Sequence, residues 1–310
     1  MHRSYHALPP FKSSKGIPTN IIYGFFGMLI KAIADFKPSH IVVCFDTPKP
    51  TFRNELFKQY QAQRPHMLDD FKVQIPILQK ALIIGGIKIL QKDGYEADDV
   101  IGTLAKKGAK ENMKVLILTG DRDIMQLVDK NIFVITPLLG MTNIKLYGEE
   151  EVKSKMLVSP SEIPELKALM GDPSDNYPGA KGIGPKTASG LIQEFKTVEN
   201  LLANLDKVKS EKVKNILKNE RENVVLSKKL ATIVTDIPLD FVFDQAPFTW
   251  FKQELKDYFT ELEIKSLKKR IFEERLPVEN NNIRPNEKEK KESKRKKNQS
   301  ANEKNQLGLF

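Results

Sequence analysis

Carboxylate side chains recur at four places in this chain, each where a predicted strand or loop meets a helix. Like charges brought into one cleft repel each other and raise one another's pKa, so such grouping is costly unless cations neutralise it. Carboxylate oxygens are also the ligands that Mg²⁺ and Mn²⁺ prefer in proteins. The acids concerned are Asp46, Glu96, Asp98, Asp99, Asp121, Asp123, Asp172 and Asp175. Their grouping predicts a site for two divalent ions, of the kind that cleaves phosphodiester bonds.

Two continuously apolar runs, 40–45 and 115–118, have the pattern of buried strands. Asp46 directly follows the first run, and Asp121 and Asp123 come just after the second. In open parallel α/β sheets, ligands bind at the carboxyl ends of the strands. Predicted helices and a further strand alternate with these runs, at 19–36, 71–85, 97–111 and 132–136. We therefore expect an α/β domain over residues 1–159, with a mostly parallel central sheet flanked by helices.

Each acid also has an ordinary structural explanation. Glu96, Asp98 and Asp99 open a helix, where acids cap free N–H groups and complement the helix dipole. Asp172 and Asp175 lie beside prolines and could form Asx turns. Acids at two strand ends, one helix start and one polar loop are, however, hard to explain as four independent accidents.

From residue 160 to about 275 the apolar residues recur at helical spacing, which predicts a smaller helical domain. Within it, segment 178–195 has the pattern helix, tight glycine hairpin, helix. Glycines allow close backbone approach, and the free N–H groups of a helix start form an anion site. We expect sequence-independent contacts with a phosphate backbone there; a plain helix–helix turn is the alternative. The residues expected to make these contacts are Gly182, Ile183, Gly184, Lys186 and Thr187.

Segment 51–74 interleaves basic and aromatic residues. Arg53, Lys58 and Arg64 could orient a single-stranded backbone while aromatic rings stack on unpaired bases. The alternative is a solvated helix face with an aromatic stripe that faces the core, and we prefer it for Phe52 and Phe57.

Composition supports a nucleic-acid partner. The 310 residues carry a formal net charge of +10 and 40% apolar residues, so the chain can bury a large core and favours polyanions. The single cysteine, Cys44, excludes a disulfide framework and a cysteine metal site. No apolar run of about 18 residues and no leader pattern occurs, so we expect a cytoplasmic protein with no membrane contact.

After residue 275 the composition changes to Asn, Glu and Lys. Such a segment cannot bury enough apolar surface to fold, so we expect a disordered basic linker over 276–305. The chain then ends in an apolar cluster at 306–310, QLGLF, which a solvated tail does not need.

Five motifs together resemble the 5′ to 3′ exonuclease domain of bacterial DNA polymerase I, which is part of the flap endonuclease family. They are HRSYHALP, FDTPKPTFR, GYEADDVIGTLAKK, LTGDRDIMQLV and LMGDPSDNYPGAKGIGPKTA, within residues 2–270. The resemblance implies structure-specific cleavage near 5′ ends of flaps, nicks and RNA primers during replication and repair, by a monomer that uses two Mg²⁺ or Mn²⁺ ions. It also implies an arch over the 5′ strand at 51–74, and a helix-hairpin-helix that can hold K⁺.

The resemblance divides the eight acids between two metal ions. Those implied for the first metal are Asp46, Glu96, Asp98 and Asp99. Those implied for the second metal are Asp121, Asp123, Asp172 and Asp175.

The chain departs from this family in three ways. The family begins with an apolar strand ending in Asp-Gly, which is missing ahead of His2, so we expect the natural polypeptide to start upstream of Met1. Gln61 stands where the family's arch usually has a lysine, and no polymerase domain follows. A catalytically impaired module that binds DNA structures is therefore the rival interpretation.

The last five residues resemble the short QLxLF peptide by which bacterial replication proteins dock on the sliding clamp. The residues expected to make this contact are Gln306, Leu307, Leu309 and Phe310. An inert terminus is the alternative.

Overall fold

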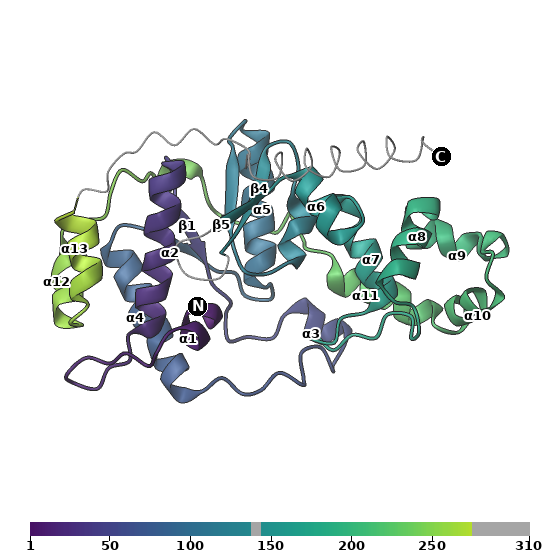
Figure 1. The fold of residues 1–310 in the computed structure, drawn as a ribbon, viewed down its shortest axis with the longest axis horizontal. Helices are drawn as coiled ribbons and strands as arrows, with labels where there is room; N and C mark the ends of the chain where they lie inside the picture. Colours follow the sequence, from purple (N-terminus) through teal and green to yellow (C-terminus); the bar gives the residue numbers. More distant parts are fainter. Residues whose placement is uncertain (138–143, 275–310) are drawn as a thin grey trace, which may run out of the picture. The chain divides into compact units, whose positions relative to one another are not determined.

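The computed structural model describes residues 1–137 and 144–274, and Figure 1 shows their helices and strands. The strands are β1 (Val42–Cys44), β2 (Lys88–Leu90), β3 (Val115–Leu118), β4 (Ile132–Pro137) and β5 (Ile144–Tyr147). The earlier α-helices are α1 (His2–Ala7), α2 (Asn20–Phe36), α3 (Phe52–Leu56), α4 (Asp69–Ile84), α5 (Ala97–Lys110) and α6 (Glu149–Met156). The later ones are α7 (Ile163–Met170), α8 (Pro185–Phe195), α9 (Val198–Ala203), α10 (Glu211–Asn219), α11 (Arg221–Ala231), α12 (Glu254–Glu261) and α13 (Lys265–Phe272). Short 3-10 helices are η1 (Asp123–Leu127), η2 (Pro160–Glu162), η3 (Leu205–Lys207) and η4 (Phe243–Gln245).

The strands form two small sheets rather than the single central sheet that we expected. β1 pairs in parallel with β2, whereas β3 pairs in parallel with β4, which pairs antiparallel with β5. Within the described residues no ladder joins β1 to β3. Helix α5 packs against both strands, so it connects the two sheets through side-chain contacts. The α/β class and the parallel pairing are confirmed, and the one-sheet expectation is corrected.

Helix α5 also points its N-terminus toward the carboxyl end of β1. Its backbone N–H at Ala97 donates to Asp46 Oδ1 at 2.8 Å, which joins the loop after β1 to the first turn of α5. The opposite end of α5 carries Lys107 and Lys110, where cations complement the helix dipole. Negative charge therefore gathers at the N-terminal end of α5, which faces the carboxyl end of β1.

Residues 239–272 pack on the N-terminal elements, whereas we expected all of 160–275 to form one helical domain. Phe248 N–H donates to Ser39 C=O at 2.8 Å, and the rings of Phe259 and Phe26 meet edge-on with centroids 5.1 Å apart. Figure 1 shows α12 and α13 beside α2 and α4, and these helices are in contact. Two helices of eight residues are too short to be stable alone, and burying their apolar faces on α2 and α4 stabilises them.

The remaining helices, α7 to α11, pack around α7, which contacts both α8 and α11. The loop between α7 and α8 depends on Gly179, whose φ of +59° favours glycine. A Cβ at position 179 would lie 2.1 Å from Gly171 N. Any residue larger than glycine would therefore prevent the backbone at 179 from approaching Gly171 this closely. The buried Ser227 hydroxyl of α11 accepts a hydrogen bond from Gly179 N–H at 3.0 Å. This hydrogen bond ties the loop, which carries Asp172 and Asp175, to α11.

Across the two described stretches, none of the helices combines the length and apolar character that crossing a bilayer requires.

Candidate metal centre

Three carboxylates from two different parts of the chain converge beside η1. Asp123 opens η1 just after β3, and Asp172 and Asp175 lie in the loop that follows α7. One oxygen of each lies within 4.8 Å of the others, and no other acidic, histidine or cysteine trio within 1–137 and 144–274 does so. Paired backbone hydrogen bonds between Asp172 and Tyr177 close the loop, at 2.9 and 3.2 Å. We call these three carboxylates the acidic trio.

The donor set of the acidic trio fits Mg²⁺ or Mn²⁺. All three ligands are hard carboxylate oxygens, which these ions prefer to softer donors. The hydroxyl of Tyr177 is buried without a hydrogen-bond partner among the described residues. Burial raises the pKa of Tyr177, and Asp123, Asp172 and Asp175 raise it further, so the phenol remains a protonated donor near the trio.

A lysine that the sequence analysis missed lies against the acidic trio. Lys167 Nζ is 2.5 Å from Asp123 Oδ1 and 2.5 Å from Asp172 Oδ2. Burial alone would lower the pKa of Lys167, but the two carboxylates outweigh it and raise the pKa. Burial raises the pKa of Asp123 to about 6, helped by Asp121 and Asp172 and opposed by Lys167. Lys167 lies in the helical apolar pattern of 163–170, which indicated only a core helix, so no sequence signal pointed to it.

A second group of carboxylates lies at the N-terminus of α5. Burial raises the pKa of Asp98 well above its usual value, and Asp121 and Asp46 raise it further. The pKa of Glu96 is raised to about 7, mainly by burial, with Arg53 opposing and Asp99 and Asp175 adding to the rise. Charges from one group thus act on the other, so the two groups share one acidic field, which divalent cations would neutralise.

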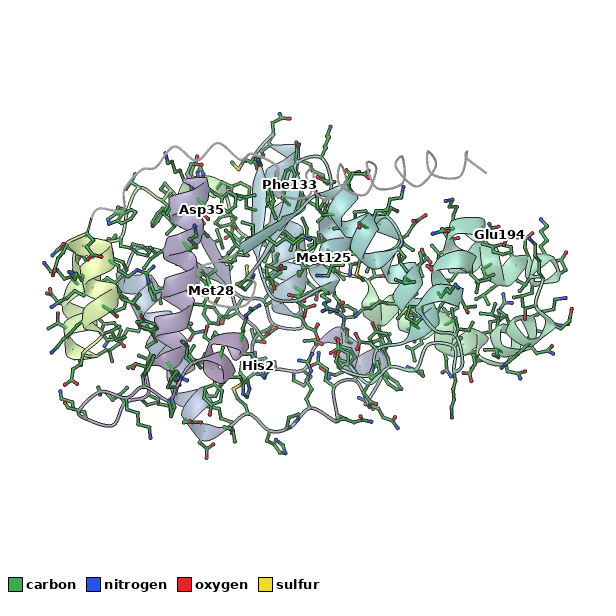
Figure 2. The ribbon with its side chains drawn as sticks, in the orientation of Figure 1. His2, Met28, Asp35, Met125, Phe133 and Glu194 are labelled. Carbon is green, nitrogen blue, oxygen red and sulfur yellow. The ribbon has the colours of Figure 1, made fainter. Side chains whose placement is uncertain are left out.

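Segment 51–74 reaches this acidic field. Tyr60 lies with its hydroxyl 3.0 Å from Asp175 Oδ2 and 3.3 Å from Glu96 Oε2, between the two groups. Arg64 Nη2 pairs with Asp175 Oδ1 at 2.5 Å, and Gln61 N–H donates to Asp175 C=O at 2.9 Å. The side chain of Lys58 is exposed. Figure 2 shows oxygen-tipped side chains gathered between α5 and α3, where this segment begins.

Arg53 and Asp99 do not take the positions that the sequence analysis expected. Arg53 is 2% exposed and Asp99 is fully buried, and they form a paired salt bridge with N–O distances of 2.7 and 2.9 Å. Arg53 also donates to the carbonyls of Leu230 and Thr232, each at 2.9 Å. Asp99 also accepts from the N–H groups of Glu96 and Val234, at 3.0 and 2.9 Å. We therefore correct both assignments: Arg53 cannot reach a DNA strand, and Asp99 has no oxygen free for a metal.

The glycine hairpin exposes most of the residues expected to contact phosphate. Gly182, Gly184, Lys186 and Thr187 are exposed, and Gly184 directly precedes α8. Ile183 is 5% exposed and its N–H donates to Ala180 C=O at 3.0 Å, so neither its side chain nor its N–H is free for a partner. The expectation for Ile183 is therefore corrected for its side chain and its N–H group. The four residues proposed to bind a clamp, Gln306, Leu307, Leu309 and Phe310, lie outside the described residues.

Comparison with known proteins identifies the family. Residues 1–157 match the model of the 5′-3′ exonuclease N-terminal resolvase-like domain, and residues 158–254 match that of the 5′-3′ exonuclease C-terminal SAM fold. The chain is 40% identical over 276 residues to a 5′-3′ exonuclease of Aquifex aeolicus, covering 87% of this chain and 91% of that protein. It is 42% identical over 247 residues to DNA polymerase I of Bacillus caldotenax, covering 80% of this chain but only 28% of the polymerase.

A solved structure supports the fold. The bacteriophage T5 flap endonuclease, in a complex with DNA and metal ions, superposes with a TM-score of 0.59 at 19% identity. The match covers 80% of this chain and 89% of the phage protein, so both share an α/β part followed by a helical part. On these matches over residues 1–254, the chain belongs to the 5′-3′ exonuclease family.

Proposed function

We propose that this protein is a structure-specific 5′ nuclease that hydrolyses phosphodiester bonds near 5′ ends of flaps, nicks and RNA primers. The observation that carries the proposal is the acidic field, where the acidic trio meets the carboxylates at the start of α5. Acids buried together in this way are expected at a site built for divalent cations. The Aquifex relative named as a 5′-3′ exonuclease, of which the chain covers 91%, supports the direction of cleavage.

The side chains of this chain would divide the work of the reaction. Divalent ions at this site would supply Lewis-acid activation of water and neutralise charge on the reacting phosphate. Asp121, Asp123, Asp172 and Asp175 would hold one ion, and Asp46, Glu96 and Asp98 would hold the other. Arg64 and Lys58, on the arch, would orient the 5′ strand by pairing with phosphates.

Cleavage of a labelled 5′-flap substrate in Mg²⁺ or Mn²⁺ tests this proposal, with EDTA and a blunt duplex as controls. We expect divalent-dependent release of the flap at the branch point. Gln61 contacts Asp175 where the family's arch usually offers a lysine, which is the observation favouring a catalytically impaired DNA-binding module. Flap binding without cleavage in either metal would establish that rival, and neither binding nor cleavage would defeat both.

We also propose that the glycine hairpin grips duplex DNA, with its backbone carbonyls holding K⁺. Lys186→Ala should weaken flap binding for all sequences alike and reduce the slope of log K against log salt by about one, because one phosphate contact is lost. Fluorescence anisotropy over a salt series measures both quantities. Lys110→Ala is the matched control, since Lys110 is exposed at the end of α5 away from the carboxylates. An unchanged salt slope in the Lys186 variant would contradict this placement.

We further propose that the QLGLF segment docks on a bacterial sliding clamp; its support is the sequence pattern at 306–310 alone. The apolar side chains would fill a pocket, and Gln306 would fix the register by hydrogen bonding. For a contact made by only five residues we expect micromolar affinity, on the order of 8 kcal/mol. A chain that ends at residue 305 should cut free flaps normally and lose clamp binding in a titration. Equal clamp affinity of the full and shortened chains would refute the proposal.

A further inference from the structure

We propose that Lys167 is a displaceable internal counter-ion of the acidic trio, so that a divalent ion must compete with its ammonium group for the same carboxylate oxygens. This inference rests on the proposed function, because it concerns the metal ion that the acidic trio would hold. It assigns a role to Lys167, a residue at the last turn of α7 that carries no carboxylate and would not itself be a ligand.

The contacts of Lys167 identify which oxygens are in competition. Asp172 Oδ1 is already used by the local loop, because Ser174 N–H and Ser174 Oγ donate to it at 2.8 and 2.6 Å. Its other oxygen, Oδ2, is the one at 2.5 Å from Lys167 Nζ. Asp123 likewise turns Oδ1 to the ammonium at 2.5 Å. The ammonium therefore engages one oxygen on each of two trio members, including the oxygen of Asp172 that the loop does not use and that an ion would take.

The surroundings make this competition strong. The side chains of Lys167, Asp123 and Asp172 are only 17, 20 and 11% exposed, so water screens their charges poorly. Without a cation, three carboxylates within 4.8 Å would repel one another. One ammonium neutralises one of the three charges and holds two of the groups together. Lysine suits this role because its charge is carried on a flexible four-carbon stem that can move aside when an ion enters.

Titration with Mn²⁺ in the absence of DNA measures the competition directly. Lys167→Met keeps the length of the side chain and removes its charge, so the variant should bind Mn²⁺ at the acidic trio at least about tenfold more tightly than the original chain. Lys167→Arg keeps the charge and should bind within about threefold of the original chain. Free Mn²⁺ is counted by electron paramagnetic resonance, and isothermal titration calorimetry gives the stoichiometry. Should the Met variant not fold, Lys167→Gln is interpreted in the same way.

Lys228 offers a matched control within the same chain. Its Nζ bridges two carboxylates, Glu165 at 2.7 Å and Glu199 at 2.6 Å, which are not part of the acidic trio. Lys228→Met removes a bridging ammonium of the same kind, and it should leave Mn²⁺ affinity unchanged. Equal tightening in both variants would show a general effect of net charge and would overturn the inference.

Thermal unfolding separates a counter-ion from a lysine that is only structural. In EDTA the Lys167→Met variant should unfold at a lower temperature than the original chain, because its carboxylates then repel without compensation. Mn²⁺ should raise its unfolding temperature more than it raises that of the original chain, since tighter binding stabilises more. A lower unfolding temperature with unchanged Mn²⁺ affinity would assign Lys167 a structural role. That result would reject the competition with the metal ion but leave the proposed function standing. Absence of Mn²⁺ binding in every variant would reject the metal centre itself, and with it the proposed function.

Discussion

Asp121→Ala should reduce cleavage of a 5′ flap by roughly a thousandfold, about 4 kcal/mol of transition-state stabilisation, without weakening flap binding. The charge of Asp121 acts on both groups of carboxylates, because it raises the pKa of both Asp98 and Asp123. Its Oδ1 also accepts a hydrogen bond from Asp123 N–H at 2.8 Å, which orients the start of η1. On the proposed function, removing Asp121 would remove one oxygen ligand of the metal centre and loosen Asp123, whereas the hairpin proposed to bind DNA would be untouched.

Single-turnover cleavage in Mg²⁺ and anisotropy without divalent ions measure the two quantities separately. Binding should be equal or slightly tighter, since one negative charge is removed from a site that faces phosphates. Asp93→Ala is the matched control: Asp93 follows β2, as Asp121 follows β3, but it is paired with Lys49 at 2.7 Å outside the acidic field. If cleavage and binding fall together in the Asp121 variant, this carboxylate serves the fold or the DNA grip rather than the reaction.

Local patterns predicted most of the elements that position the site. The apolar run 115–118 is β3 with the same bounds, and the helix expected at 97–111 is α5. β2 and β5 have no strand pattern in the sequence. Each has only three or four residues of mixed polarity, which become strands only through pairing with distant partners. The packing of residues 239–272 on the N-terminal elements could not be predicted either. Helical spacing shows which face of a helix is apolar, but not which element covers that face.

The sequence proposed the candidate site at the level of residue types, and the corrections to it come from contacts between distant residues. Asp123, Asp172 and Asp175 converge as expected of metal ligands. Asp99 has the same residue type and lies one position after Asp98, yet Arg53, 46 positions earlier in the chain, takes up its oxygens. Lys167 could not be recognised from the sequence, because a lysine in an amphipathic helix ordinarily faces solvent rather than buried carboxylates. Acids that bind metals and acids that bind arginine have the same local pattern, so only the fold distinguishes them.

Arg53→Met should destabilise the folded protein by about 3 to 5 kcal/mol, because it leaves the carboxylate of Asp99 buried without its partner. The side chain of Arg53 makes contacts that no exposed arginine could make: it joins α3 to α5 through Asp99, and to the end of α11 through Leu230 and Thr232. It also lies 3.3 Å from Glu96 Oε2, so its loss removes a positive charge from the acidic field. The decrease is measured from urea unfolding, followed by the fluorescence of Trp250 and by circular dichroism.

Arg64→Met is the matched control for this loss. Arg64 also pairs with a carboxylate of the site, Asp175, but its side chain is 54% exposed, so the pair should contribute about 1 kcal/mol or less to the free energy of unfolding. Equal destabilisation by the two substitutions would mean that burial does not distinguish these arginines. That result would also remove the reason for reassigning Arg53 from DNA contact to the core.

A double-mutant cycle then tests whether the pair acts as a unit. Asp99→Asn keeps an oxygen that can accept from the N–H groups of Glu96 or Val234 and removes the negative charge. Combined with Arg53→Met it leaves neither charge of this pair in the interior, so the double variant should be more stable than Arg53→Met alone, with a coupling energy above about 1 kcal/mol. Losses that simply add would show that Arg53 and Asp99 contribute independently. Glu96 and Asp98 flank Asp99 at the start of α5, and in the double variant Arg53 no longer holds this helix start. The double variant should therefore cleave flaps more slowly than the original chain even at temperatures where it is fully folded.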